Sequence, residues 1–118
     1  RLKGKVPEFG ATRNPIDLSG AILTQESLFE EVLNLFAQAR NLDGFAIIST
    51  YIRNPAFAHA IVRMYRVTDK PVVVCWTGSA EQTPESLAIL TESGIPIYGN
   101  TGRVALAFRA IRGDTDIA

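Results

Sequence analysis

Four short, mainly apolar runs punctuate the chain, at residues 16–18, 45–49, 72–76 and 95–98. Runs of this length bounded by Gly, Pro, Asp or Ser are typical of buried strands. The run 45–49 is apolar enough to predict a strand with no wet face. Pro96 lies near the start of the last run and favours a position near a sheet edge.

After each run, apolar residues recur every three or four positions, which predicts an amphipathic helix. Thr24 is expected to cap the first helix, which ends near residues 41–44. Pro55 opens the second, Thr83 caps the third and Gly94 closes it. The last follows the turn 100–102. The residues expected to face inward are Leu28, Val32, Leu35, Phe36, Ala39, Phe57, Ala58, Ile61, Val62, Tyr65, Leu87, Ile89, Leu90, Val104, Ala105, Phe108 and Ile111.

The predicted order is therefore βαβαβαβα. Strands that alternate with helices indicate an α/β protein with a parallel sheet of about four strands covered by helices on both faces. We expect an irregular lead-in over residues 1–13, one domain over 14–112 and a tail over 113–118.

Composition narrows the class of protein. The chain has 118 residues, of which 47% are hydrophobic, and its 12 basic and 12 acidic residues balance. A neutral chain has no global field to recruit nucleic acid, and the apolar runs are too short to cross a bilayer. These features predict a soluble, cytoplasmic domain. The single cysteine, Cys75, is expected to be a buried small hydrophobe.

The predicted loops after the strands carry the candidate chemistry. In an open parallel sheet, ligands bind beyond the carboxyl ends of the strands. Those ends carry Ser19-Gly20-Ala21, Ser49-Thr50-Tyr51, Thr77-Gly78-Ser79 and Gly99-Asn100-Thr101-Gly102. Small residues let backbone amides approach a ligand, and the N-terminus of the helix after residues 19–25 favours an anion. The pattern indicates a phosphate or oxyanion site, although many turns have this composition for reasons of geometry alone.

The charged and titratable residues give weaker indications of a site than the loops do. Arg53 and Arg103 are the cations best placed to hold a phosphate oxygen, and either is also read as a solvated surface residue. Asp17, within the first run, is either a structurally satisfied carboxylate or part of the site. His59 is the one histidine and has no partner cluster, so we interpret it as an ordinary helix residue. No dinucleotide fingerprint or Walker P-loop occurs.

Four strings in register carry a family resemblance: Arg13-Asn-Pro-Ile-Asp-Leu-Ser-Gly, Asp43-Gly-Phe-Ala-Ile-Ile, Lys70-Pro-Val-Val-Val-Cys-Trp-Thr-Gly and Ser93-Gly-Ile-Pro-Ile-Tyr. In this order they resemble the NDP-forming (ADP-forming) acyl-CoA synthetases of the succinyl-CoA synthetase-like superfamily. The likeness spans roughly residues 6–111 and is to the later half of the second flavodoxin-like ligase domain. It implies a flavodoxin-like three-layer αβα fold.

The resemblance also implies a function. Family members join a carboxylic acid to coenzyme A at the expense of ATP or GTP with Mg, through an acyl phosphate and a phosphohistidine that shuttles between sites. Carried over, Ser19, Gly20 and Ala21 contact the phosphoryl group, and Ser49, Thr50, Thr77 and Gly78 line the same pocket. His59 does not match the family's phosphorylated histidine, which belongs to another ligase domain.

The partners implied are the CoA-binding, histidine-bearing and ATP-grasp domains or subunits of a synthetase. The Gly-rich first half of the domain is missing, so we expect the isolated chain to be inactive, to bind no cofactor alone, and to dock to other domains or self-associate. The alternatives are the ligand-sensing synthetase-like region of a bacterial protein acetyltransferase, a flavin-binding flavodoxin-like module and a non-catalytic interaction domain.

Overall fold

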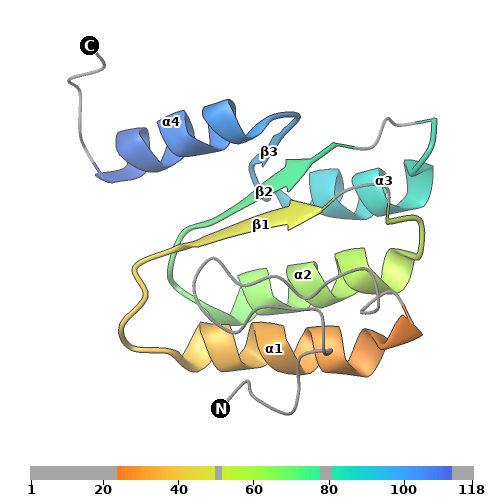
Figure 1. The fold of residues 1–118 in the computed structure, drawn as a ribbon, viewed down its shortest axis with the longest axis horizontal. Helices are drawn as coiled ribbons and strands as arrows, with labels where there is room; N and C mark the ends of the chain where they lie inside the picture. Colours follow the sequence, from red (N-terminus) through yellow and green to blue (C-terminus); the bar gives the residue numbers. More distant parts are fainter. Residues whose placement is uncertain (1–23, 50–51, 78–80, 113–118) are drawn as a thin grey trace.

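The computed structural model describes residues 24–49, 52–77 and 81–112. Strands and helices alternate along this part of the chain (Figure 1). The strands are parallel and lie in the order β1-β2-β3. The elements are α1 (Glu26–Gln38), β1 (Phe45–Ser49), α2 (Pro55–Val67), β2 (Val72–Trp76), α3 (Pro84–Ser93), β3 (Ile97–Tyr98) and α4 (Thr101–Arg112).

This arrangement confirms the predicted α/β, flavodoxin-like fold. The helices α2 and α3 each connect one parallel strand to the next, and the order advances in one direction across the sheet. Helices α1, α2 and α3 pack together on one face, and α4 lies on the other (Figure 1). The strand expected at residues 16–18 lies outside the described residues.

The ends of α2 and α3 follow the residues that the sequence singles out, whereas both ends of α1 differ from the prediction. Pro55 and Pro84 occupy the first turns of α2 and α3, where a missing N–H costs nothing. Gly94 ends α3 with φ of 86°, a left-handed conformation in which a Cβ is strained. Helix α1 begins one residue later than predicted, with Gln25 instead of Thr24 at its N-cap position, and no side-chain bond caps it. Helix α1 ends at Gln38, before the turn expected near residues 41–44.

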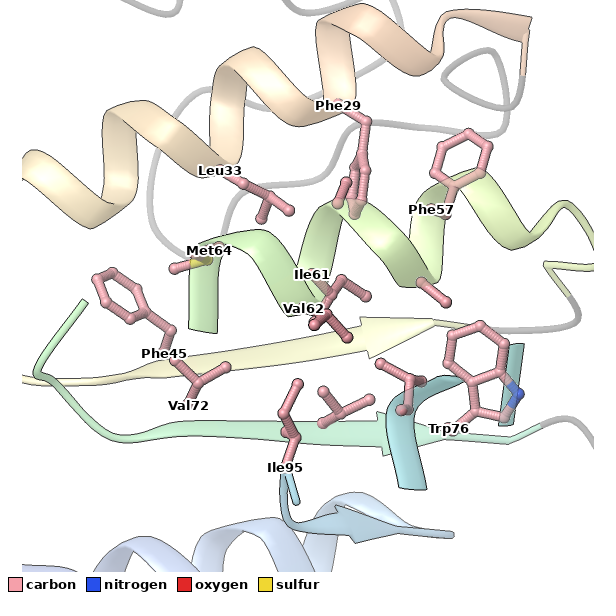
Figure 2. Packing of buried hydrophobic residues seen from close by; sticks show 14 residues of the cluster. Phe29, Leu33, Phe45, Phe57, Ile61, Val62, Met64, Val72, Trp76 and Ile95 are labelled. Atoms are coloured by element: carbon pink, nitrogen blue, oxygen red, sulfur yellow. The ribbon is translucent and has the colours of Figure 1, made fainter. Parts of the chain in front are cut away.

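The main core fills the space between the sheet and helices α1, α2 and α3 (Figure 2). Val72, Val74 and Trp76 alternate along β2 toward these helices, as the period of two in a strand requires. The rings of Phe29 and Phe57 join α1 to α2, with centroids 5.0 Å apart. Both α2 and α3 are therefore anchored by apolar packing to the same face of the sheet.

The opposite face has a much smaller core. Val73 and Cys75 point to this side of β2 and pack with Val104 of α4, while Tyr98 and Phe108 lie at the margin of this cluster. A Cβ on Gly44 would lie 2.9 Å from the Phe108 ring, so a side chain at residue 44 would require that ring to move. Helix α4 thus covers β2 and the start of β1.

Several expectations about burial prove wrong on this second face. The strand at 45–49 has a wet side, because Ala46 is exposed and Ile48 is 60% exposed. Ala105 and Ile111 of α4 are exposed instead of inward, and the side of α4 that packs on the sheet carries Val104, Ala107 and Phe108.

Two differences concern the first face and the sheet edge. In α1 the buried residues are Phe29, Val32 and Leu33, of which only Val32 was predicted to face inward. The buried face of the helix includes Phe29 because its ring packs on Phe57. The last strand contains Ile97–Tyr98 alone. Pro96 precedes it, and its carbonyl accepts a hydrogen bond from Val74 N at 3.0 Å, which supports the predicted edge position.

Candidate functional site

The carboxyl ends of β1 and β2 meet at one edge of the sheet, as the parallel order requires. Ser49 ends β1 and Thr77 follows β2. The Thr77 amide and Thr77 Oγ1 both donate to the Ser49 carbonyl, at 3.2 and 3.3 Å. This pair fixes the start of the loop after β2 against the end of β1. Of these two residues, Ser49 is buried and Thr77 is exposed.

The predicted site is brought together only in part within the described residues. Ser49 and Thr77 are adjacent, in agreement with the expectation that their loops share an edge. The remaining predicted residues lie outside the described ranges and stay predictions; they are Ser19, Gly20, Ala21, Thr50 and Gly78.

A buried hydrogen bond at the same edge escaped the sequence reasoning. Trp76 Nε1 donates to Thr83 Oγ1 at 2.9 Å, and both residues are almost fully buried. Thr83 occupies the N-cap position of α3 as predicted, but no side-chain bond from it caps the helix. The indole therefore ties the end of β2 to the residue that precedes α3. A tryptophan at a strand end near a Thr-Pro pair was the available signal, because a buried indole N–H requires an acceptor.

Helix α3 also carries an unsatisfied hydroxyl. Ser86 is fully buried and its Oγ has no hydrogen-bond partner. It shares a helix face with Leu90, four residues on, and so faces the core. This position adds nothing to the exposed edge at Thr77.

The N-terminus of α2 is capped at this end of the fold. Asn54 Oδ1 accepts from the Ala56 amide at 3.0 Å, and Asn54 Nδ2 donates to Glu26 Oε1 at the start of α1. The starts of α1 and α2 therefore lie side by side. Arg53 precedes this cap and is exposed, consistent with either reading given to it above.

The second candidate cation, Arg103, belongs to α4 on the opposite face of the sheet. Its amide donates to Asn100 Oδ1 at 2.8 Å, a bond of the helix-capping kind, and its side chain is exposed. Arg53 lies in the loop before α2, whereas Arg103 lies in α4 on the opposite face of the sheet, and we assign them no shared ligand.

The resolved pKa shifts in the described part of the chain belong to an ion pair between α1 and α2. Arg63 Nε and Nη2 donate to the two carboxylate oxygens of Glu30, at 2.6 and 2.9 Å. This hydrogen bonding lowers the pKa of Glu30 and raises the pKa of Arg63. This two-bond ion pair joins α1 to α2 and is not part of the candidate site at the carboxyl edge of the sheet.

Two other expectations concern residues that the structure places clearly. His59 is exposed on α2, and Cys75 is completely buried in β2. Within residues 24–49, 52–77 and 81–112, no three His, Cys, Asp or Glu side chains gather as a metal-ligand group. No helix in the same ranges is long and apolar enough to cross a membrane.

Comparison with known proteins gives one informative similarity. The chain is 28% identical over 111 residues to the alpha subunit of the ADP-forming acetate–CoA ligase I of Pyrococcus furiosus. The aligned region is 90% of this chain and 23% of the relative, so the chain spans about a quarter of that protein's length. No protein-family model matches the chain. No solved structure matches it either.

This similarity is consistent with the superfamily relationship that the four sequence strings indicate. It runs along nearly the whole chain, so it does not depend on one motif. It supports a ligase-related domain of α/β fold whose relative is one subunit of a larger enzyme.

Proposed function

We propose that this chain is a domain of an NDP-forming acyl-CoA synthetase, and that its carboxyl edge stabilises a phosphoryl group in transit. The observation that carries the proposal is the similarity over 111 residues to a subunit of an ADP-forming acetate–CoA ligase. The adjacency of Ser49 and Thr77 at the end of the parallel sheet supports the location.

The proposed contribution is electrostatic. Helix N-termini, backbone amides and hydroxyls that are already in position stabilise developing negative charge without reorganising. In this proposal Ser19, Gly20 and Ala21 contact the phosphoryl group, and Thr50 and Gly78 complete the wall that Ser49 and Thr77 begin. The Glu30–Arg63 ion pair joins α1 to α2, and the proposal assigns charge stabilisation at this edge to dipoles and hydroxyls.

The rest of the reaction belongs to the proposed parent enzyme. ATP or GTP supplies the phosphoryl group and coenzyme A accepts the acyl group, with the phosphorylated histidine on another ligase domain. His59, exposed on the second helix, takes no part. The described residues offer no gathered carboxylates or imidazoles for Mg, so no step here is assigned to a metal.

A phosphate titration of the 118-residue chain followed by amide NMR tests the site. Inorganic phosphate is expected to shift the amides of Thr77 and of residues 19–21, with coenzyme A and flavin mononucleotide as comparison ligands. Gly20→Asp places a carboxylate beside the anion and is expected to abolish the shifts. Gly20→Asn has nearly the same size without the charge and is the matched control.

The outcomes separate the proposal from its alternatives. Equal phosphate shifts in Gly20→Asp and Gly20→Asn would remove the site assignment. Shifts produced by flavin mononucleotide and not by phosphate would make the domain a flavin module. In a complete synthetase that carries this domain, Gly20→Asp is expected to abolish turnover while the fold, followed by circular dichroism, is retained.

A further inference from the structure

The segment between β2 and α3, residues 77–82, begins with two of the residues that the proposed site uses, Thr77 and Gly78. Trp76 immediately precedes this segment and Thr83 immediately follows it. The hydrogen bond from Trp76 Nε1 to Thr83 Oγ1, at 2.9 Å, joins these two residues and closes the segment into a short loop. A link between the two ends of a chain segment reduces the number of conformations that the segment can adopt.

Thr83 makes this bond instead of the one usual for its position. A threonine at an N-cap position normally accepts from a backbone amide in the first turn of its helix. Asn54 and Asn100 do so at the starts of α2 and α4, where they accept from the amides of Ala56 and Arg103. Thr83 does not cap α3, and its hydroxyl oxygen accepts from the indole. A departure from a local rule marks a position where another requirement prevails.

Burial makes the indole bond a firm anchor at the carboxyl edge of the sheet. Trp76 is 3% exposed and Thr83 is 1% exposed, and a buried indole N–H that loses its acceptor is unfavourable. Thr77 is the next residue along the chain, and its amide and hydroxyl both donate to the Ser49 carbonyl. The start of the loop is therefore held on one side by the end of β1 and on the other side by the residue that precedes α3.

We infer that Thr83 is a positioning residue for the proposed phosphate site, and that through Trp76 it holds Thr77 in the geometry that receives the anion. Thr83 is itself almost completely buried, so it acts through its neighbours and not by contact with the ligand. A geometry that is already in place lowers the entropy that binding costs. The inference rests on the proposed function, because phosphate is the ligand whose affinity it concerns.

Phosphate affinity in matched variants tests this role. The dissociation constant of inorganic phosphate is measured from the shift of the Thr77 amide in the 118-residue chain. Thr83→Val removes the acceptor and is expected to raise this constant about fivefold or more. Thr83→Ser keeps the hydroxyl and is expected to bind phosphate nearly as tightly as the wild type.

Val72→Ala is the control for a loss of stability alone. Val72 is 2% exposed and belongs to the same core cluster as Trp76, but it lies at the opposite end of β2 (Figure 2). Its truncation weakens the core without touching the carboxyl edge. The phosphate dissociation constant of Val72→Ala is therefore expected to equal that of the wild type.

Hydrogen exchange measures the positioning without a ligand. Thr77 is exposed, and amides in such places exchange through local opening rather than through global unfolding. Exchange at the Thr77 amide is expected to be several-fold faster in Thr83→Val than in Val72→Ala, and to return to the wild-type rate in Thr83→Ser.

Failure of the inference and failure of the proposed function give different results. If Thr83→Val and Val72→Ala have the same phosphate affinity or the same exchange rate at Thr77, the indole bond has no positioning role. If Thr83→Ser loses as much affinity as Thr83→Val, the hydroxyl is not the group that acts. Both results leave the phosphate site in place. A wild-type chain whose Thr77 amide does not respond to phosphate would instead overturn the proposed site, and this inference with it.

Discussion

Ile48 and Cys75 occupy the same rung of the sheet and point to the same side, yet one is 60% exposed and the other is completely buried. On the other side of the sheet, Phe45, Val72, Val74 and Trp76 are all buried beneath helices. Among the described residues the two faces of the sheet thus differ in their cover: three helices pack on the first face, and one helix covers part of the second. Strand composition alone does not reveal this difference, because β1 and β2 are similarly apolar.

The comparison implies that the stability of the domain resides mainly in the first face. Its cluster contains three aromatic rings from the helices and strands, Phe29, Phe45 and Phe57, together with the indole of Trp76. The second cluster has Val73, Cys75 and Val104 as its buried members. Because apolar burial scales with the area removed from water, equal substitutions are expected to cost more on the first face.

The largest expected effect is that of Phe57→Ala. Phe57 is 1% exposed and contacts Phe29 across the helix pair, so its removal leaves a cavity in the main cluster. The unfolding free energy is expected to fall by about 3–5 kcal/mol, measured by urea denaturation. Leu106→Ala, on the exposed side of α4, is the control and is expected to change it by about 0.5 kcal/mol or less. Similar losses in both variants would break the comparison.

Thr83→Val tests the buried bond that joins β2 to α3. Valine keeps the shape of threonine but leaves the Trp76 indole N–H without its acceptor in a buried position. The expected loss is about 1–3 kcal/mol of unfolding free energy. Thr83→Ser keeps the hydroxyl and is expected to retain more of that stability, and Trp76→Phe combined with Thr83→Val is expected to lose less than the sum of the two single changes. Strictly additive losses would show that the bond contributes nothing.

A matched pair of valines compares the faces directly. Val62 on α2 and Val104 on α4 are 6% and 5% exposed, so Val→Ala removes the same atoms from similarly buried positions. Val104→Ala is expected to cost about 1.5 kcal/mol, close to the transfer term alone, and Val62→Ala more, because the denser cluster relaxes less around the cavity. Denaturation gives both values. A larger loss in Val104→Ala would reverse the ranking of the two faces.

The predictable parts of this fold are those set by local chemistry. The bounds of β2, the Pro55 and Pro84 helix starts and the Gly94 helix end follow from β-branched runs, fixed φ angles and a left-handed residue. The exposure of Ile48 was not predictable in this way. It depends on which element lies over β1, and the local sequence Phe-Ala-Ile-Ile-Ser is the same whether or not a helix covers it.

In the candidate site, too, the parts set by local sequence and strand order were predictable and the parts set by tertiary contacts were not. The adjacency of Ser49 and Thr77 follows from parallel strand order, which alternating strands and helices predict. The Trp76–Thr83 bond required a tertiary contact, since Thr83 exchanges a capping role for an indole partner seven residues earlier. Residues 19–21 lie outside the described residues, so their role stays a prediction from the loop composition, the helix N-terminus and the family resemblance.

The smallest expected effect is that of the Glu30–Arg63 ion pair, on the face of the sheet that α1, α2 and α3 cover. Arg63 lowers the pKa of Glu30 by hydrogen bonding, so Glu30 stabilises the fold above its unfolded pKa, near 4.3, and this contribution is lost as pH falls through the lower folded value. Both side chains are more than a third exposed, so the contribution is about 0.5 kcal/mol. The measurement is unfolding free energy from pH 6 to pH 3 in wild type and Glu30→Gln. The two curves are expected to converge at the acid end, whereas Glu92→Gln, an exposed acid in α3, is expected to run nearly parallel to wild type. A loss of several kcal/mol in Glu30→Gln would mean that charge, and not apolar packing, holds α1 on α2.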